Sequence, residues 1–83
     1  MIKPEIVLKL KEQFKAEMNA YTAYEMLLEH IDDDYLECAL KEIMYDEYLH
    51  AKFLRSYMIE EGLYDPNQHL ECEKIYNKII ENE

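Results

Sequence analysis

The sequence predicts an all-α protein, an antiparallel helical hairpin followed by a C-terminal helix. Three observations support this prediction. Only one glycine and two prolines interrupt 83 residues rich in helix formers, apolar residues recur at helical spacing, and turn or capping residues separate three such segments. A single domain of this size buries only about 60% of the surface of its unfolded chain. A partner, a metal or a second copy is therefore expected to add stability.

The first helix is expected over about residues 4–31, with Pro4 in its first turn. Its apolar stripe consists of Ile6, Val7, Leu10, Phe14, Met18, Tyr21 and Leu28. The triplet Asp32-Asp33-Asp34 then interrupts the stripe and predicts a tight turn, because Asp is poor inside helices but caps their N-termini well. The alternative is one helix through the triplet, which contains neither glycine nor proline. The hairpin is favoured, since very long uncapped helices usually belong to coiled coils or membranes.

The second helix is expected over about residues 34–61 and the third over about 66–81, all within one domain, 1–83. The second ends before Gly62, a natural C-terminal cap. For the third, Asp65 is the expected N-cap, Pro66 the first position and Gln68 the capping-box residue. The apolar positions of these two helices are Leu36, Leu40, Ile43, Leu54 and Tyr57, then Leu70, Cys72, Ile75, Tyr76, Ile79 and Ile80.

The formal charge of −10 disfavours nucleic acids and anionic membranes as partners, because both are bound through clustered Lys and Arg. The N-terminal segment has no signal-peptide core, and no apolar run is long enough to span a membrane. Cys38 and Cys72 form no CxxC pair and suit free thiols in a reducing compartment, or else one disulfide. We expect a cytoplasmic protein.

Three ionisable residues, Glu17, Glu47 and His50, interrupt the apolar stripes. A buried carboxylate without a partner costs several kcal/mol, so such groups are paired, hydrogen-bonded or bound to a cation. One interpretation is a buried Glu–His–Glu salt-bridge network. The metal interpretation is preferred, because no Lys or Arg lies at the same levels of the stripes to compensate two glutamates.

The spacing of these residues supports a metal site. Glu47 and His50 are three residues apart and share one helix face. Glu17 and Glu47 are equally distant from the Asp triplet, about 22 Å along each helix, so an antiparallel hairpin places them opposite each other. Four-helix di-iron proteins need two helices that each give one Glu and two that each give Glu-x-x-His. This chain carries half of that set.

The same residues resemble a known family. Glu17, followed thirty residues later by the D-E-Y-L-H-A-K-F-L segment that begins at Asp46, is similar to the ferritin-like superfamily with its rubrerythrin-type D-E-x-x-H-A helix. The short length is most similar to the encapsulated ferritin-like proteins, whose two-helix subunits dimerise. The resemblance covers roughly residues 5–61.

This resemblance implies a ferritin-like four-helix bundle with Glu17, Glu47 and His50 of two chains as catalytic metal ligands. It implies iron, two ions per dimer; Mn and Zn are the alternative ions. The implied activity is that of a ferroxidase or peroxidase-type oxidoreductase, which oxidises Fe(II) with oxygen or peroxide. The implied partners are a second copy, further dimers in a ring, and an encapsulating shell protein that would place the chain inside a nanocompartment.

Two questions remain open on the sequence. Tyr21 and Tyr24 lie close to Glu17 on the same helix and are candidates to hydrogen-bond a ligand carboxylate or donate an electron; core packing is the commoner role for tyrosine in small bundles. The alternative functions are a non-catalytic module whose metal only staples a dimer, and a metal-free acidic helical interaction module.

Overall fold

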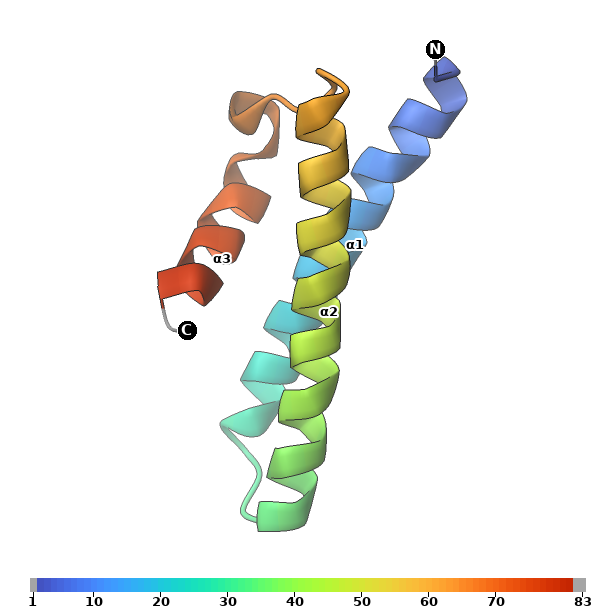
Figure 1. Ribbon diagram of the computed structural model, residues 1–83. Helices are drawn as coiled ribbons and strands as arrows, with labels where there is room; N and C mark the ends of the chain where they lie inside the picture. Colours follow the sequence, from blue (N-terminus) through green and yellow to red (C-terminus); the bar gives the residue numbers. More distant parts are fainter. Residues whose placement is uncertain (1, 82–83) are drawn as a thin grey trace.

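The computed structural model describes residues 2–81 and confirms the all-α prediction (Figure 1). Helix α1 spans Pro4–Leu28 and helix α2 spans Asp34–Glu60. A short 3-10 helix, η1, spans Pro66–His69 and leads into α3, Leu70–Glu81. The molecule is elongated, 48 × 21 × 17 Å, because α1 and α2 form an antiparallel pair that runs its whole length, while α3 lies beside one half of the pair.

The turn between α1 and α2 forms at the Asp triplet, which excludes the single-helix alternative. The side chain of Asp33 accepts a hydrogen bond from the Leu36 amide at 2.9 Å and so caps α2. Helix α1 ends at Leu28, three residues before the predicted end. The reason is a tightened last turn, in which His30 donates its amide to the Leu27 carbonyl at 3.0 Å instead of continuing the α-helical pattern.

Helix α2 ends in the predicted glycine cap. Gly62 has a φ of 70°, a backbone conformation that side chains with a Cβ rarely adopt. Its amide bonds to the Ile59 carbonyl at 3.1 Å, and the Leu63 amide bonds to the Met58 carbonyl at 2.8 Å. These two bonds are the Schellman motif. They turn the chain back so that α3 descends alongside the hairpin.

The predicted third helix is divided, because its first turn is 3-10 and not α-helical. Asp65 caps this turn as expected, since its side chain accepts from the Asn67 amide at 2.9 Å. Its carbonyl accepts from the Gln68 amide at 3.0 Å and contacts Nδ1 of His69 at 3.1 Å. The bond from Gln68 spans three residues, which is the 3-10 spacing.

The hydrophobic core lies between α3 and one face of the hairpin. Phe14, Met18 and Met58 are fully buried. The rest of this cluster consists of Tyr48, Ala51, Cys72, Tyr76 and Ile79. Several predicted stripe positions are exposed instead, namely Ile6, Leu36, Ile43, Leu70 and Ile80. Ile6, Leu36 and Ile43 are exposed because α3 covers only one side of the hairpin, whereas Leu70 and Ile80 belong to α3 itself and are not among its buried residues, Cys72, Tyr76 and Ile79.

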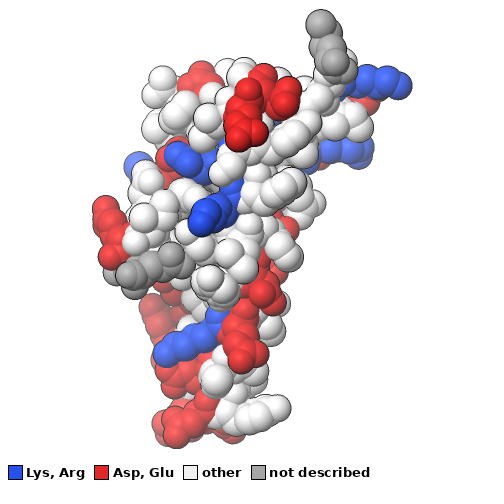
Figure 2. All heavy atoms as spheres, in the orientation of Figure 1, with Lys and Arg blue, Asp and Glu red and all other residues white. Residues whose placement is uncertain are grey.

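Charge is unevenly distributed along the molecule. The half that contains the turn, residues 25–46, holds eight acidic residues and a single lysine, Lys41. Figure 2 shows acidic side chains gathered over this lower end, whereas most of the visible lysines and arginines lie in the upper half. None of the helices in residues 2–81 combines the length and the apolar character that a membrane crossing requires.

Candidate metal centre

The hairpin brings the three predicted site residues together. Glu17 comes from the middle of α1, and Glu47 and His50 come from the middle of α2. One ligand atom from each of the three lies within 4.8 Å of the others. Among residues 2–81 they form the one group of three or more His, Cys, Asp or Glu side chains that converges in this way. We call it the Glu-Glu-His trio.

Glu17 is the buried member of the trio, with 8% of its surface exposed. Its Oε1 accepts a hydrogen bond from Nε2 of Gln13 at 3.0 Å. Its Oε2 is buried and accepts no hydrogen bond from a described donor, although Nδ1 of His50 lies 3.5 Å away. No Lys or Arg of the described chain pairs with the trio. A buried carboxylate oxygen left this way is incompletely compensated.

The two carboxyl groups of the trio lie close enough together to change each other's pKa. A hydrogen bond between two carboxyl groups requires that one be protonated, and Glu47 is the one whose pKa is raised; when both are ionised, Oε2 of Glu17 has no described hydrogen-bond donor. The hydrogen bond with Glu17, burial and the Glu17 charge raise the pKa of Glu47 to about 7. Burial opposes ionisation of Glu17, but hydrogen bonds with Glu47 and Gln13 and the nearby His50 hold its pKa below the ordinary value.

The raised pKa of Glu47 predicts the pH dependence of the metal-free protein. The folded state binds this proton more tightly than the unfolded state does, so the contribution is complete below pH 4.5 and is lost as pH rises through about 7. Chelator-treated protein should lose about 1–2 kcal/mol of unfolding free energy between pH 5 and 8. This loss is smaller than the full pKa shift of Glu47 would give, because water reaches the carboxyl group. Urea titrations would measure this loss. A Glu47→Gln variant with the same pH slope would contradict the assignment.

Of the other polar and aromatic residues considered for the site, some lie near the trio and some lie apart from it. Tyr21 packs against the core, and Tyr24 is half-buried; their part in the site stays a prediction. Gln13 was missed by sequence reasoning, although its position four residues before Glu17 places both on one helix face. His69 lies apart, stacked on Tyr64 at 5.0 Å between ring centroids. Cys38 and Cys72 are free thiols, so no disulfide joins them.

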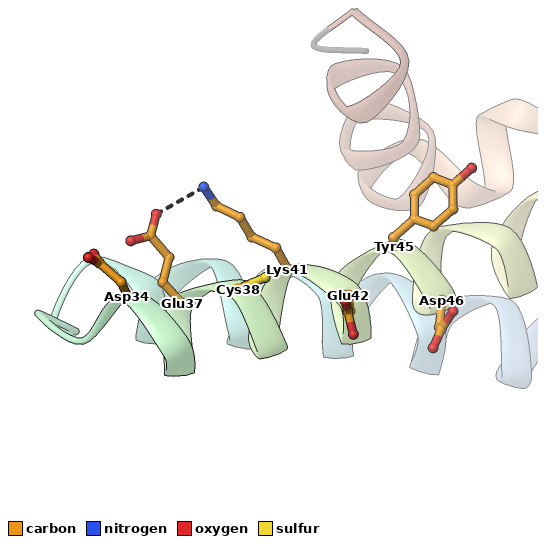
Figure 3. A pocket seen from close by; sticks show the side chains of 7 residues that line it. All are labelled: Asp34, Glu37, Cys38, Lys41, Glu42, Tyr45 and Asp46. Atoms are coloured by element: carbon orange, nitrogen blue, oxygen red, sulfur yellow. Dashed lines mark ion pairs between the residues drawn. The ribbon is translucent and has the colours of Figure 1, made fainter.

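A separate hollow of about 600 Å³ lies on α2 in the acidic half, and the trio does not line it (Figure 3). Lys41 reaches back to Glu37, with Nζ and Oε1 2.9 Å apart. Glu42 and Asp46 lie along the opposite side of the helix in this view. These carboxylates spread along the helix instead of converging, so the hollow does not form a second cluster of ligands.

The trio opens onto the hairpin face that α3 does not cover. On α2 this face carries a stripe at seven-residue spacing, Leu36, Ile43, His50 and Tyr57; on α1 it carries Ile6, Gln13, Ala20 and Leu27. On α2, each of Ile43, His50 and Tyr57 is followed directly by a buried residue. Because successive residues of a helix are about 100° apart, this stripe is turned by that angle away from the core. The His50 side chain is 60% exposed and Phe53 beside it is 70% exposed. We call these two stripes the open face.

Comparison of the chain with protein-family models, with curated proteins and with solved structures finds no match.

Proposed function

We propose that the chain is a metal-binding subunit whose Glu-Glu-His trio holds one ion, and that two copies pair through their open faces to form a four-helix di-iron centre that oxidises Fe(II). The observation that carries this proposal is the buried Oε2 of Glu17, which accepts no hydrogen bond, beside a second carboxyl and an imidazole. A divalent cation would compensate this oxygen. Two carboxylates and one imidazole are suitable ligands for Fe(II) or Mn(II), and Zn(II) also accepts them.

The alternative of a simple ion-pair network explains the trio less well. The His50–Glu17 separation of 3.5 Å is long for a charge-assisted bond, and the imidazole is mostly in water. With one member 60% exposed and at this distance, the pair contributes little to stability. This contribution does not offset the cost of two carboxyl groups placed against each other, which for Glu47 appears as a pKa raised to about 7.

The open face favours a second copy as the partner. Apolar residues at seven-residue spacing are typical of helices that pack side by side in a bundle. Ile43 and Leu36 are 38% and 45% exposed, and Leu27 on the α1 stripe is 47% exposed. His50 sits in the middle of its stripe, so a two-fold axis through this face would place the trios of two chains opposite each other. Pairs of this kind can associate further into rings or within a shell.

The residues of the paired site have distinct roles. Glu17 and Glu47 supply charge that favours the ferric state over the ferrous state, and His50 supplies a neutral nitrogen ligand. Two Fe(II) ions supply the two electrons that, with two protons, reduce oxygen to hydrogen peroxide or reduce hydrogen peroxide to two waters. The net charge of −10 raises the local concentration of cations around the protein. In this proposal, the Fe(II) that is oxidised is the substrate.

The decisive experiment is an anaerobic Fe(II) titration followed by exposure to air, with near-ultraviolet absorbance and oligomer mass recorded together. The wild type should bind one Fe(II) per chain, form a dimer or a multiple of it, and oxidise the iron rapidly. Ile43→Asp, which places a charge on the open face without touching a ligand, should give a monomer that binds Fe(II) weakly and does not oxidise it. Ile59→Asp is the matched control, because Ile59 is 48% exposed and lies outside both stripes.

Each other outcome selects a different function. Stoichiometric binding and dimerisation without oxidation would indicate a metal-stapled module. No binding at micromolar Fe(II) would overturn the metal proposal and leave an acidic helical interaction module. Normal dimerisation and oxidation by Ile43→Asp would show that pairing does not use the open face.

A further inference from the structure

One hydrogen bond to the trio has a consequence for how a metal ion would be bound. Nε2 of Gln13 donates to Oε1 of Glu17 at 3.0 Å, from a position one helical turn earlier on α1. Only the other oxygen, Oε2, lies near Nδ1 of His50, at 3.5 Å, and it accepts no hydrogen bond from a described donor. The carboxylate therefore has one oxygen engaged by an amide and one oxygen directed at the other ligands.

We propose that Gln13 is a positioning residue of the metal centre, which keeps Oε1 of Glu17 away from the ion so that this glutamate binds through Oε2 alone. This role rests on the proposed function of the trio. Binding through both oxygens would require the carboxylate to rotate and give up the Gln13 bond. Holding it to one oxygen leaves a coordination position free, and a site that reacts with oxygen or peroxide needs such a position.

The location of Gln13 strengthens this role. It lies on the α1 stripe of the open face, in the same stripe as Ala20, and its side chain is exposed in a single chain. A second copy on this face would remove water from the amide and from Oε1. Hydrogen bonds in such a less polar environment are stronger, so pairing of two chains would fix the orientation of Glu17 further.

The test compares Gln13→Leu and Gln13→Met, which both remove the donor at similar size, with Gln68→Leu as the matched control. Gln68 is exposed on η1, and its side chain makes no hydrogen bond within residues 2–81. Fe(II) alone is the probe. Anaerobic titration gives its affinity, and the infrared difference between Fe(II)-loaded and metal-free protein gives the separation of the two carboxylate stretches. This separation is larger for binding through one oxygen than through two.

We expect wild type and Gln68→Leu to show the large separation. Both Gln13 variants should show a component with the small separation and bind Fe(II) about tenfold more weakly, the effect typical of losing a partner that orients a ligand. Unchanged infrared bands and affinity in both Gln13 variants would overturn the role of Gln13 and leave the metal site intact. No Fe(II) binding by the wild type would instead overturn the proposed function, and the role of Gln13 with it.

Discussion

Replacing Glu47 by glutamine is expected to abolish Fe(II) binding and oxidation while the metal-free protein stays folded. The amide has nearly the shape of the protonated carboxyl and can still donate to Glu17, whereas it is a much weaker ligand for a divalent cation. The loss of affinity should exceed the roughly 10–100-fold effect of removing a partner that only orients a ligand. Anaerobic Fe(II) titration measures it directly, and circular dichroism confirms that the helices are retained.

The control for this substitution is Glu42→Gln, one of the exposed carboxylates of α2. It makes the same change of charge and should bind and oxidise Fe(II) as the wild type does. If Glu47→Gln and Glu42→Gln weaken binding equally, the chain binds cations through its overall negative charge. The trio would then have no special role.

Arg55→Met is expected to cost about 3 kcal/mol of unfolding free energy. The Nε and Nη2 atoms of Arg55 bond to Glu73 on α3, at 2.6 and 3.4 Å, and the guanidinium lies 4.7 Å from the ring centroid of Tyr76. Burial opposes ionisation of Glu73, but Arg55 and the Tyr64 hydroxyl hold its pKa below the ordinary value. Methionine keeps the apolar stem and leaves a carboxylate that is only 12% exposed without its cation. Urea denaturation followed by circular dichroism measures the loss.

Two comparisons make this prediction specific to the buried pair. The double variant Arg55→Met/Glu73→Leu should recover much of the lost stability, because replacing both members of a buried pair avoids the uncompensated charge. Lys74→Met should change stability by less than about 0.5 kcal/mol, since Lys74 and its partner Glu71 are 72% and 86% exposed. Equal losses for Arg55→Met and Lys74→Met would mean that the Arg55–Glu73 pair does not hold α3 in place.

The sequence predicted the helices well where local chemistry decides the structure. Asp33 and Gly62 each satisfy backbone groups within a few residues, so their positions fix where α2 begins and ends. It predicted less well which apolar residues are buried. Ile43 and Met44 both suit a core stripe, and only the side on which α3 packs makes Met44 buried and Ile43 38% exposed. The side on which α3 packs depends on contacts between segments far apart in the sequence, such as the ion pair of Arg55 and Glu73.

The convergence of Glu17, Glu47 and His50 could be predicted because it needs only helical spacing and the position of the turn. The different environments of the two glutamates could not. Glu17 is the more buried because it lies between Phe14 and Met18 on α1, which are fully buried in the core cluster that includes residues of α3. The hydrogen bond from Gln13 to Glu17 could not be predicted either, since a glutamine at this spacing often points into solvent.

The position of α3 allows the core to form within one chain before any pairing of chains. Phe14, Met18 and Met58 reach zero exposure against residues of the same chain. Closure of the core is therefore unimolecular, and its rate does not depend on how many copies are present. The proposed association of two copies would instead follow mass action and slow on dilution. A newly synthesised chain can thus close its core alone, and expression level would govern only the proposed pairing of two copies.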